Sequence, residues 1–562
     1  MLADIGEGYR WGREELAASG ALTLTDLLER IPGVTTFRSG WIGAPHVAAM
    51  MGDFTRIRVF YDGVELDALD PRMGGMNDLS FVNIWQLEEV RIERGAGEVR
   101  VHLRSWRVRS TTPSTRVDIA TGDLDTNGYR GFFGRRFAHG EVLQLGAYQY
   151  SSQDPRGQGD AEQLSLFGRV GWAKGGFSVD GSFVRTNRDR SLQTRDEELA
   201  RPDLPRMDAR YTEAYARVGY TDTTRGIWGQ LIAGSLNHSQ NNLAVPTTPP
   251  TGGTNGGTNG GANGGTGGTG TDTDADEIPE RLNFTRAQYV AAFGWGRDAL
   301  SLSSTTRFRS IDGELKVAPS IRLAYDTPRL ALSLFGEEQP ERDQRRVEAS
   351  GRLLPLSWLA VGGSVGRYAD THPPSLTRAT SLAWRAEVGV RVKRAWFTGG
   401  LMSRDTAVLI APVVYDTGFR SAAARAMTGT FVRFRGKFWK DVGVDVSAIQ
   451  WDSGGAFRPE YQTRSQLYVN TGWLSRFPSG NFNVLAAVTH EYRTVAYFPL
   501  ATGDPLRSSQ YRTLDFLLEI RLLQATLTYQ FRNALNAQFT QLPGFPIHRP
   551  AQVYGVRWHF FN

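Results

Sequence analysis

The 562-residue sequence contains no cysteine. Disulfide bridges, thiolate metal sites and cysteine nucleophiles are therefore excluded. It also lacks any apolar run near the ~18 residues that a spanning helix requires, which excludes a helical membrane protein. Strong charge bias is absent too, because the net charge is +6 and the Lys and Arg residues are not gathered in blocks. This spread is typical of a solvated face and gives no reason to expect nucleic-acid binding.

Two further signals are missing from the first 21 residues. The opening segment MLADIGEGYRWGREEL carries acidic residues and no continuous apolar stretch, so we do not expect it to be a secretory signal. No short extended energy-coupling segment is recognisable there either. We treat residues 1–21 as an N-terminal extension.

From about residue 111 onward, apolar and polar residues alternate with the period of β-strands. In the segment LSLFGRVGW, Leu164, Leu166 and Val170 alternate with Ser165 and Arg169. Strands of about ten residues, apolar on one face and charged or Gly/Ser-rich on the other, are typical of a transmembrane barrel around a watery lumen. The mean hydropathy of −0.35 fits this reading, because only every other strand residue meets lipid.

Residues 248–277 are rich in Gly, Thr and Asn and cannot bury apolar surface, so we expect an outward-pointing flexible loop. Asp272, Asp274 and Asp276 alternate there like calcium ligands. A calcium loop also requires Gly at its sixth position and Glu at its twelfth, where this chain has Glu277 and Asn283. A solvated acidic loop is the favoured interpretation, with calcium binding as the alternative.

The segment that precedes the strands has a different pattern. In LTLTDLLERIPGV, Leu24, Leu27, Leu28 and Ile31 share one helical face, and a Pro-Gly pair ends the helix. An Asp-Gly turn in RIRVFYDGVEL predicts a hairpin, and WQLEEVRIERGAGEVRVHL predicts further short strands. A compact α+β unit is therefore expected before the strands.

Three regions together resemble one known family. The order LTDLLERIPGV, RIRVFYDGVEL and WQLEEVRIERGAGEV is similar to the plug domain of TonB-dependent outer-membrane receptors. Residues 366–392, GRYADTHPPSLTRATSLAWRAEVGVRV, resemble the middle of the barrel of these receptors, and residues 527–561 resemble its closing strands. Their front, middle and end positions span nearly the whole chain.

The resemblance implies a transmembrane β-barrel of about 22 antiparallel strands with an N-terminal α+β plug domain inside the lumen. About 450 residues remain after the plug, or about 20 per strand, which suits that class of barrel. We expect a plug domain at residues 22–110 and the barrel at residues 111–562.

The resemblance also implies a receptor in the outer membrane of a Gram-negative-type bacterium. Its partners would be outer-membrane lipid, an extracellular small ligand (a metal chelate, glycan or peptide) and an inner-membrane TonB-type complex. Because no coupling segment is recognisable, a non-energised barrel with an adhesion, display or structural role remains the alternative.

Enzymatic chemistry is not supported by the motifs. The segment GGSVG at 362–366 matches a nucleophile elbow, but it sits in an alternating strand followed by Pro373-Pro374, where no helix can begin. None of the eight histidines forms an HExxH motif. We expect no catalytic residue, no metal ligand, no cofactor and no enzyme activity.

Candidate ligand contacts lie on two plug loops, which would form the floor of an external site. Met and aromatic side chains on such loops suit an amphipathic ligand, although packing against the barrel wall explains each of them equally well. The candidates are Arg38, Trp41, His46, Met50, Met51, Arg72, Met73, Met76 and Asn77.

Overall fold

A computed structural model describes the chain except at residues 1–4, 6–8, 42, 68–72, 74, 155–158, 196–202, 222–225, 244–280, 312–313, 341–342, 373–376, 475, 548–549 and 561–562. The acidic loop at 272–277 and the low-complexity stretch at 248–277 lie outside the described residues. No described helix has the length and apolar character needed to cross a bilayer.

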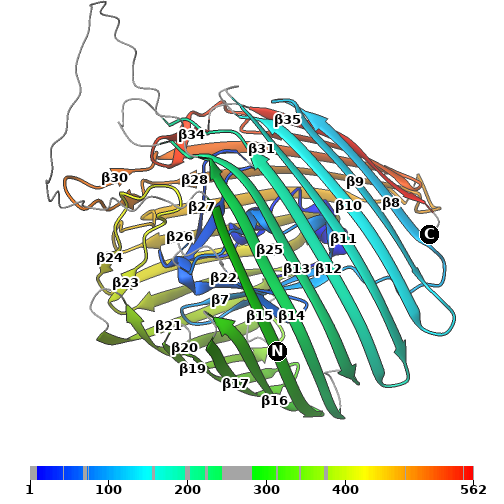
Figure 1. The fold of residues 1–562 in the computed structure, drawn as a ribbon, viewed down its shortest axis with the longest axis horizontal. Helices are drawn as coiled ribbons and strands as arrows, with labels where there is room; N and C mark the ends of the chain where they lie inside the picture. The colour runs from blue at the N-terminus through cyan, green and yellow to red at the C-terminus, as the bar shows by residue number, and fades with distance from the viewer. Residues whose placement is uncertain are drawn as a thin grey trace, which may run out of the picture.

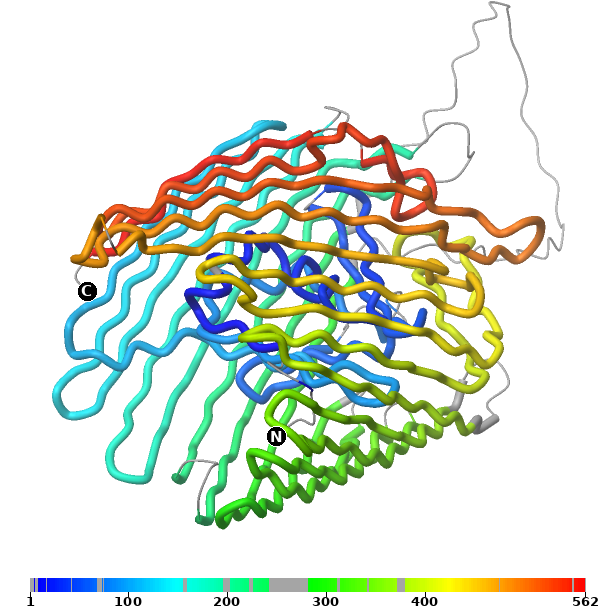
Figure 2. Tube along the Cα trace, turned by 180° about the vertical axis from the view of Figure 1, so that it is seen from behind, coloured from blue at the N-terminus to red at the C-terminus, as the bar shows by residue number. Residues whose placement is uncertain are grey.

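An α+β plug precedes the barrel and lies inside it (Figures 1 and 2). Its five-stranded sheet has the order β1-β6-β7-β4-β5. The elements are β1 (Arg10–Gly12), α1 (Arg13–Ala18), α2 (Leu24–Leu28), β2 (Val34–Arg38), β3 (His46–Met50), η1 (Phe54–Arg56), β4 (Ile57–Tyr61), β5 (Val64–Leu66), η3 (Leu79–Phe81), η4 (Ile84–Gln86), β6 (Leu87–Arg94) and β7 (Val99–Ser105). The sheet includes β1, although the sequence predicts that the plug begins only at residue 22. The two expected domain boundaries stay predictions.

The barrel is closed by 22 antiparallel strands, so the predicted fold class is confirmed. The strands are β8 (Ser114–Gly122), β9 (Thr126–Arg136), β10 (Glu141–Gln153), β11 (Asp160–Lys174), β12 (Phe177–Arg190), β13 (Arg206–Tyr220), β14 (Gly226–Leu243), β15 (Arg281–Arg297), β16 (Leu300–Ile311), β17 (Glu314–Asp326), β18 (Leu330–Gln339), β19 (Gln344–Leu356), β20 (Leu359–His372), β21 (Thr377–Val392), β22 (Arg394–Arg404), β25 (Met427–Trp439), β26 (Val442–Trp451), β27 (Tyr461–Thr471), β28 (Phe482–Arg493), β31 (Tyr511–Leu522), β32 (Ala525–Arg532) and β35 (Ala551–Phe560).

The two rims of the barrel differ in their connections. One rim, called the turn rim, carries mostly short turns, such as the single residue between β21 and β22. The opposite loop rim carries long connections at residues 191–205, 405–426, 452–460, 494–510 and 533–550. Short strand pairs lie within three of these loops: β23 (Ala407–Leu409) with β24 (Ala422–Ala424), β29 (Tyr497–Phe498) with β30 (Leu506–Arg507), and β33 (Phe539–Leu542) with β34 (Phe545–Ile547).

Alternation separates the two faces of the wall as predicted. Leu164, Leu166 and Val170 are exposed on the outer face, whereas Ser165 and Arg169 are buried toward the plug. The strands run from 8 to 18 residues, so many exceed the predicted ten. Their hydrogen-bond ladders continue past the ~10 residues that a tilted strand needs to span the hydrocarbon.

Tryptophans near the ends of the barrel strands mostly reach the outer face, but Trp451 does not. Its register on β26 turns it inward, where it is 3% exposed and packs with the plug core. The guanidinium of Arg458 lies 4.6 Å from its ring centroid. Exposed members of the set are Trp172, Trp439, Trp473 and Trp558.

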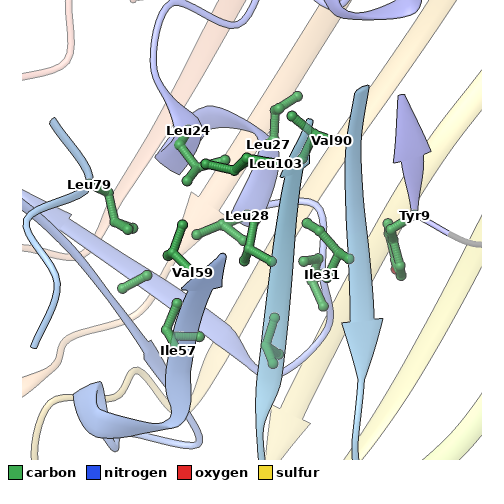
Figure 3. Packing of buried hydrophobic residues seen from close by; sticks show 14 of the residues in the cluster. Tyr9, Leu24, Leu27, Leu28, Ile31, Ile57, Val59, Leu79, Val90 and Leu103 are labelled. Carbon is green, nitrogen blue, oxygen red and sulfur yellow. The ribbon is translucent and has the colours of Figure 1, made fainter. Parts of the chain in front are cut away.

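The apolar face of the predicted helix forms the centre of the plug core (Figure 3). Leu24, Leu27, Leu28 and Ile31 are all fully buried. Regular α-helix ends at Leu28, because the next backbone bonds tighten to three-residue spacing, with Ile31 N donating to the Leu28 carbonyl at 3.0 Å. Ile31 is nevertheless buried in the plug core with the three leucines.

The alternation makes a stability prediction. Leu518 on β31 lies on the outer face and is 37% exposed, whereas Thr528 on the adjacent β32 faces inward beside Glu519. Leu518→Arg should cost ~2–4 kcal/mol of folding free energy, because a cation at mid-wall meets hydrocarbon. Thr528→Arg is the matched control and should cost little. Equal losses on refolding into lipid vesicles would contradict the assignment of faces.

Candidate ligand site at the plug–barrel interface

A buried charged seam joins the plug sheet to one side of the barrel. Arg58 Nε lies 2.6 Å from Glu65 Oε1, and Arg58 Nη1 lies 2.5 Å from Glu337 Oε2 on β18. Arg100 Nη2 lies 2.8 Å from Glu348 Oε1 on β19. Further pairs across the seam are Arg94–Glu387, Arg322–Glu93, Arg309–Glu65 and Arg346–Glu98. Buried charges are tolerated only when paired in this way, so the seam fixes the seat of the plug.

The β4–β5 turn is anchored to a second part of the wall. Asp62 and Gly63 both have positive φ, 48° and 97°, as the predicted two-residue turn requires. The Asp62 carboxylate accepts bonds from Tyr215 Oη on β13 at 2.6 Å and from Ser105 N at 3.1 Å. Burial acts to raise the pKa of Asp62, but Arg107 and other guanidiniums hold it at about 2. The turn therefore presents a fixed anion to the wall.

Five phenylalanines close the loop rim over the plug; we call them the aromatic lid. Phe37 and Phe54 come from the plug, and Phe419, Phe457 and Phe498 come from three long loops. Ring centroids lie 5.6 Å apart for Phe37–Phe498, 5.6 Å for Phe54–Phe457 and 5.1 Å for Phe419–Phe498. All five are at most 2% exposed. In this state, the loops cover the plug.

Most of the predicted contact residues are buried in this structure. Trp41, His46, Met50, Met51, Met73 and Met76 are buried beneath the loops or in the plug core. Met73 and Asn77 line a cavity, whereas Met50 and Met51 join the core around α2. Arg38 pairs with Asp26 at 3.0 Å, and Trp41 Nε1 donates to Ser152 on β10 at 3.0 Å. Arg72 lies outside the described residues. Ligand contact for the nine stays a prediction.

His46 stands out because its imidazole is buried without a hydrogen bond. The residue is 1% exposed, and neither ring nitrogen has a partner. It pairs with Arg38 across the β2–β3 ladder. Burial and the Arg38 guanidinium together lower the pKa of His46 to about 4, against the opposing effect of Asp78. The side chain is therefore neutral at pH 7.

This shift gives a pH dependence. Between about pH 6.5 and pH 4 the unfolded chain protonates His46 while the folded chain does not, so stability falls as the pH falls and then levels off. From pH 7 to pH 4.5 the loss from this group should be about 2.5 kcal/mol. His46→Gln should remove that increment, seen as a shallower pH slope in denaturant unfolding. Identical slopes for the two proteins would contradict the buried neutral imidazole.

A cavity of about 210 Å³ lies between the plug and the wall. Its plug side is formed by β4 and η3, and its barrel side by β12, β13 and β14. Residues 413–417 of a long loop and residues 203–205 complete its lining. Its lining is mostly apolar, and we take this cavity as the candidate ligand site.

Sequence reasoning missed the barrel side of this cavity. Tyr211, Glu213 and Tyr215 share the inner face of β13, and their alternation with Thr212 and Ala214 could have placed them in the lumen. Alternation does not give a residue's height along the wall or the plug element that it meets. The cavity therefore could not be located from the sequence.

Comparison with known proteins agrees with this architecture. Residues 10–102 match the family model of the TonB-dependent Receptor Plug Domain. A search of curated proteins found no match. Similar solved structures include the FrpB iron transporter of Neisseria meningitidis (TM-score 0.72, 8% identity), the siderophore receptor PirA of Acinetobacter baumannii (0.68, 10%) and the ferric enterobactin receptor PfeA of Pseudomonas aeruginosa (0.68, 10%). Each comparison covers 98% of both chains.

A wall of 22 strands around a seated α+β domain is the architecture of a plugged β-barrel of the largest class. Residues 10–102 match the plug-domain family of TonB-dependent receptors, and the whole chain shares the fold of the solved receptors named above. The recognition made from three sequence regions is therefore confirmed.

Proposed function

We propose that the protein binds a ligand outside the cell and imports it across the outer membrane of a Gram-negative-type bacterium. The observation that carries this proposal is the seated plug inside a very wide barrel. A wall of 22 strands encloses a lumen wide enough for solutes, so passage requires the plug to move. An inner-membrane TonB-type complex is the proposed source of energy.

The proposed ligand is a metal chelate, a glycan or a peptide. The similar structures named as a siderophore receptor, an iron transporter and a ferric enterobactin receptor favour the metal chelate among these three. A role as an enzyme is not proposed. Ser364 of the elbow-like segment lies within strand β20, without the strand-to-helix turn that such a nucleophile needs.

A non-energised barrel with an adhesion, display or structural role is the second candidate. The two candidates differ in whether ligand accumulates inside the cell at the expense of energy.

The test is uptake by cells that display the full chain. Labelled ferric chelates, oligosaccharides and peptides are offered with and without a protonophore. Import predicts accumulation of one class above cells with an empty vector, and the protonophore should abolish it. Surface binding that is insensitive to the protonophore, with no accumulation, would favour the second candidate.

A further inference from the structure

The cavity contains a buried carboxylate that lacks a partner. Glu213 lies on β13, lines the cavity and is only 4% exposed. Its Oε1 accepts no hydrogen bond, and no described residue forms an ion pair with it. An isolated charge is costly to bury, so carboxylates at such depth are normally paired.

A second unpartnered polar group faces the same space. Tyr61 ends β4 of the plug, lines the cavity and is 3% exposed, and its hydroxyl has no hydrogen-bond partner. Glu213 is near enough to act electrostatically on that hydroxyl. The two groups belong to different domains, so the cavity has an oxygen-rich end shared by plug and barrel.

The other charges of the cavity are already matched. Among its described lining residues, five are carboxylates and one is a guanidinium. The Asp67, Asp78 and Asp416 carboxylates pair with Arg286, Arg188 and Arg195 respectively, and Asp203 accepts a bond from the Arg195 backbone. Of the five lining carboxylates, Glu213 alone has no partner among the described residues.

Arg190, the single guanidinium of the cavity lining, is too far from Glu213 to form an ion pair with it. Arg190 is opposite Met207 in the β12–β13 ladder, whereas Glu213 is opposite Val184. Six residues along a strand correspond to about 20 Å, farther than the two side chains can bridge. Arg190 instead donates to the Pro205 carbonyl at 2.6 Å, near the loop rim.

Apolar and aromatic surfaces line the space beside Glu213. Leu79, Phe81 and Tyr211 are among them, and the rings of Phe81 and Tyr211 stack with centroids 5.3 Å apart. His238 meets the Phe81 ring edge-on at 5.6 Å. The Arg188 guanidinium already lies 4.1 Å from the Phe81 ring centroid, so these rings offer a ligand apolar surface that favours a hydrocarbon body.

We propose that this cavity binds an amphipathic organic cation, with its ammonium group against Glu213 and Tyr61 and its apolar body along Phe81 and Tyr211. The inference goes beyond the proposed function, because it assigns a ligand class to this cavity whether or not the same ligand is imported. Binding itself requires no energy source and can be measured apart from import.

The experiment uses the full chain in detergent and three probes of one shape. 1-Naphthylmethylamine is a cation at pH 7, 1-naphthylmethanol is neutral and 1-naphthoate is an anion. The cation should bind about ten-fold or more tighter than the alcohol, and the anion weakest, because a hydrogen bond to a charged group is worth that factor. Glu213→Gln, nearly identical in shape, should reduce the affinity for the cation to that for the alcohol.

Two further variants make the test specific. Glu141→Gln, at an exposed position on β10, should leave all three affinities unchanged. Val184→Phe, which fills the cavity opposite Glu213, should weaken binding of both the cation and the alcohol. Equal affinity of the wild type for cation and alcohol, or cation binding unaffected by Glu213→Gln, would overturn the inference. Loss of energised uptake with cation binding intact would count against the proposed function alone.

Discussion

Removal of residues 1–105 is expected to leave a barrel that still inserts and that conducts as a large, permanently open pore. The wall satisfies its own hydrogen bonds, from β8 through to the β35–β8 closure, and does not need the plug for them. The plug lies inside the lumen, with its core around α2 (Figures 1 and 2). Planar-bilayer recordings should show conductance rising from near zero to that of a wide channel.

Removal of residues 248–277 provides the control for this deletion. These residues are expected to form an outward loop, so their loss should leave conductance near zero. Insertion of each variant is checked by resistance of the barrel to protease. A correctly inserted barrel that remains closed without residues 1–105 would show that the plug does not block the lumen.

Truncation of Arg58 is expected to produce the largest effect of any single substitution considered for this protein. Arg58→Met would leave Glu65, Glu337 and Glu98 with one fewer cation in a seam where all are at most 3% exposed. Removing one member of a buried ion pair typically costs about 3–5 kcal/mol. The midpoint of plug unfolding in guanidinium chloride should therefore fall, with channel openings appearing at lower denaturant.

Arg10 provides the matched control. It also pairs with a glutamate, Glu89, but its side chain is 67% exposed. Arg10→Met should cost less than about 1 kcal/mol, because exposed pairs contribute little. Adding Glu337→Gln to Arg58→Met should recover part of the loss. Similar effects for Arg10→Met and Arg58→Met would mean that the seam does not hold the plug.

Much of the fold was predictable because its signals are local. Alternation marks the strands, the Asp62-Gly63 pair sets a two-residue turn, and the spacing of Leu24, Leu27 and Leu28 identifies one buried helical face. Boundaries were less accurate: α2 ends early at Leu28, and the strands extend beyond ten residues. The ends of helices and strands depend on tertiary contacts and on inter-strand hydrogen bonds, and the local sequence pattern carries no information about either.

The candidate site was less predictable, because it depends on contacts between distant segments. The plug loops that carry Met73 and Asn77 were identified, but the cavity also needs Glu213 on β13 and a loop 200 residues further along. Trp41 and His46 looked suited to an exposed ligand surface, yet both are buried. Which loops fold over the plug is set by three-dimensional packing alone.

The seam and the aromatic lid hold the plug by forces that respond to temperature in opposite ways. Separation of Phe37 from Phe498 hydrates apolar surface, a process with a positive heat-capacity change, so the lid weakens on cooling. Pairs such as Arg58–Glu337 behave differently, because ion hydration becomes less favourable as temperature rises. Cold therefore loosens the outer closure first, while the charged contacts deeper in the barrel still hold the plug in its seat.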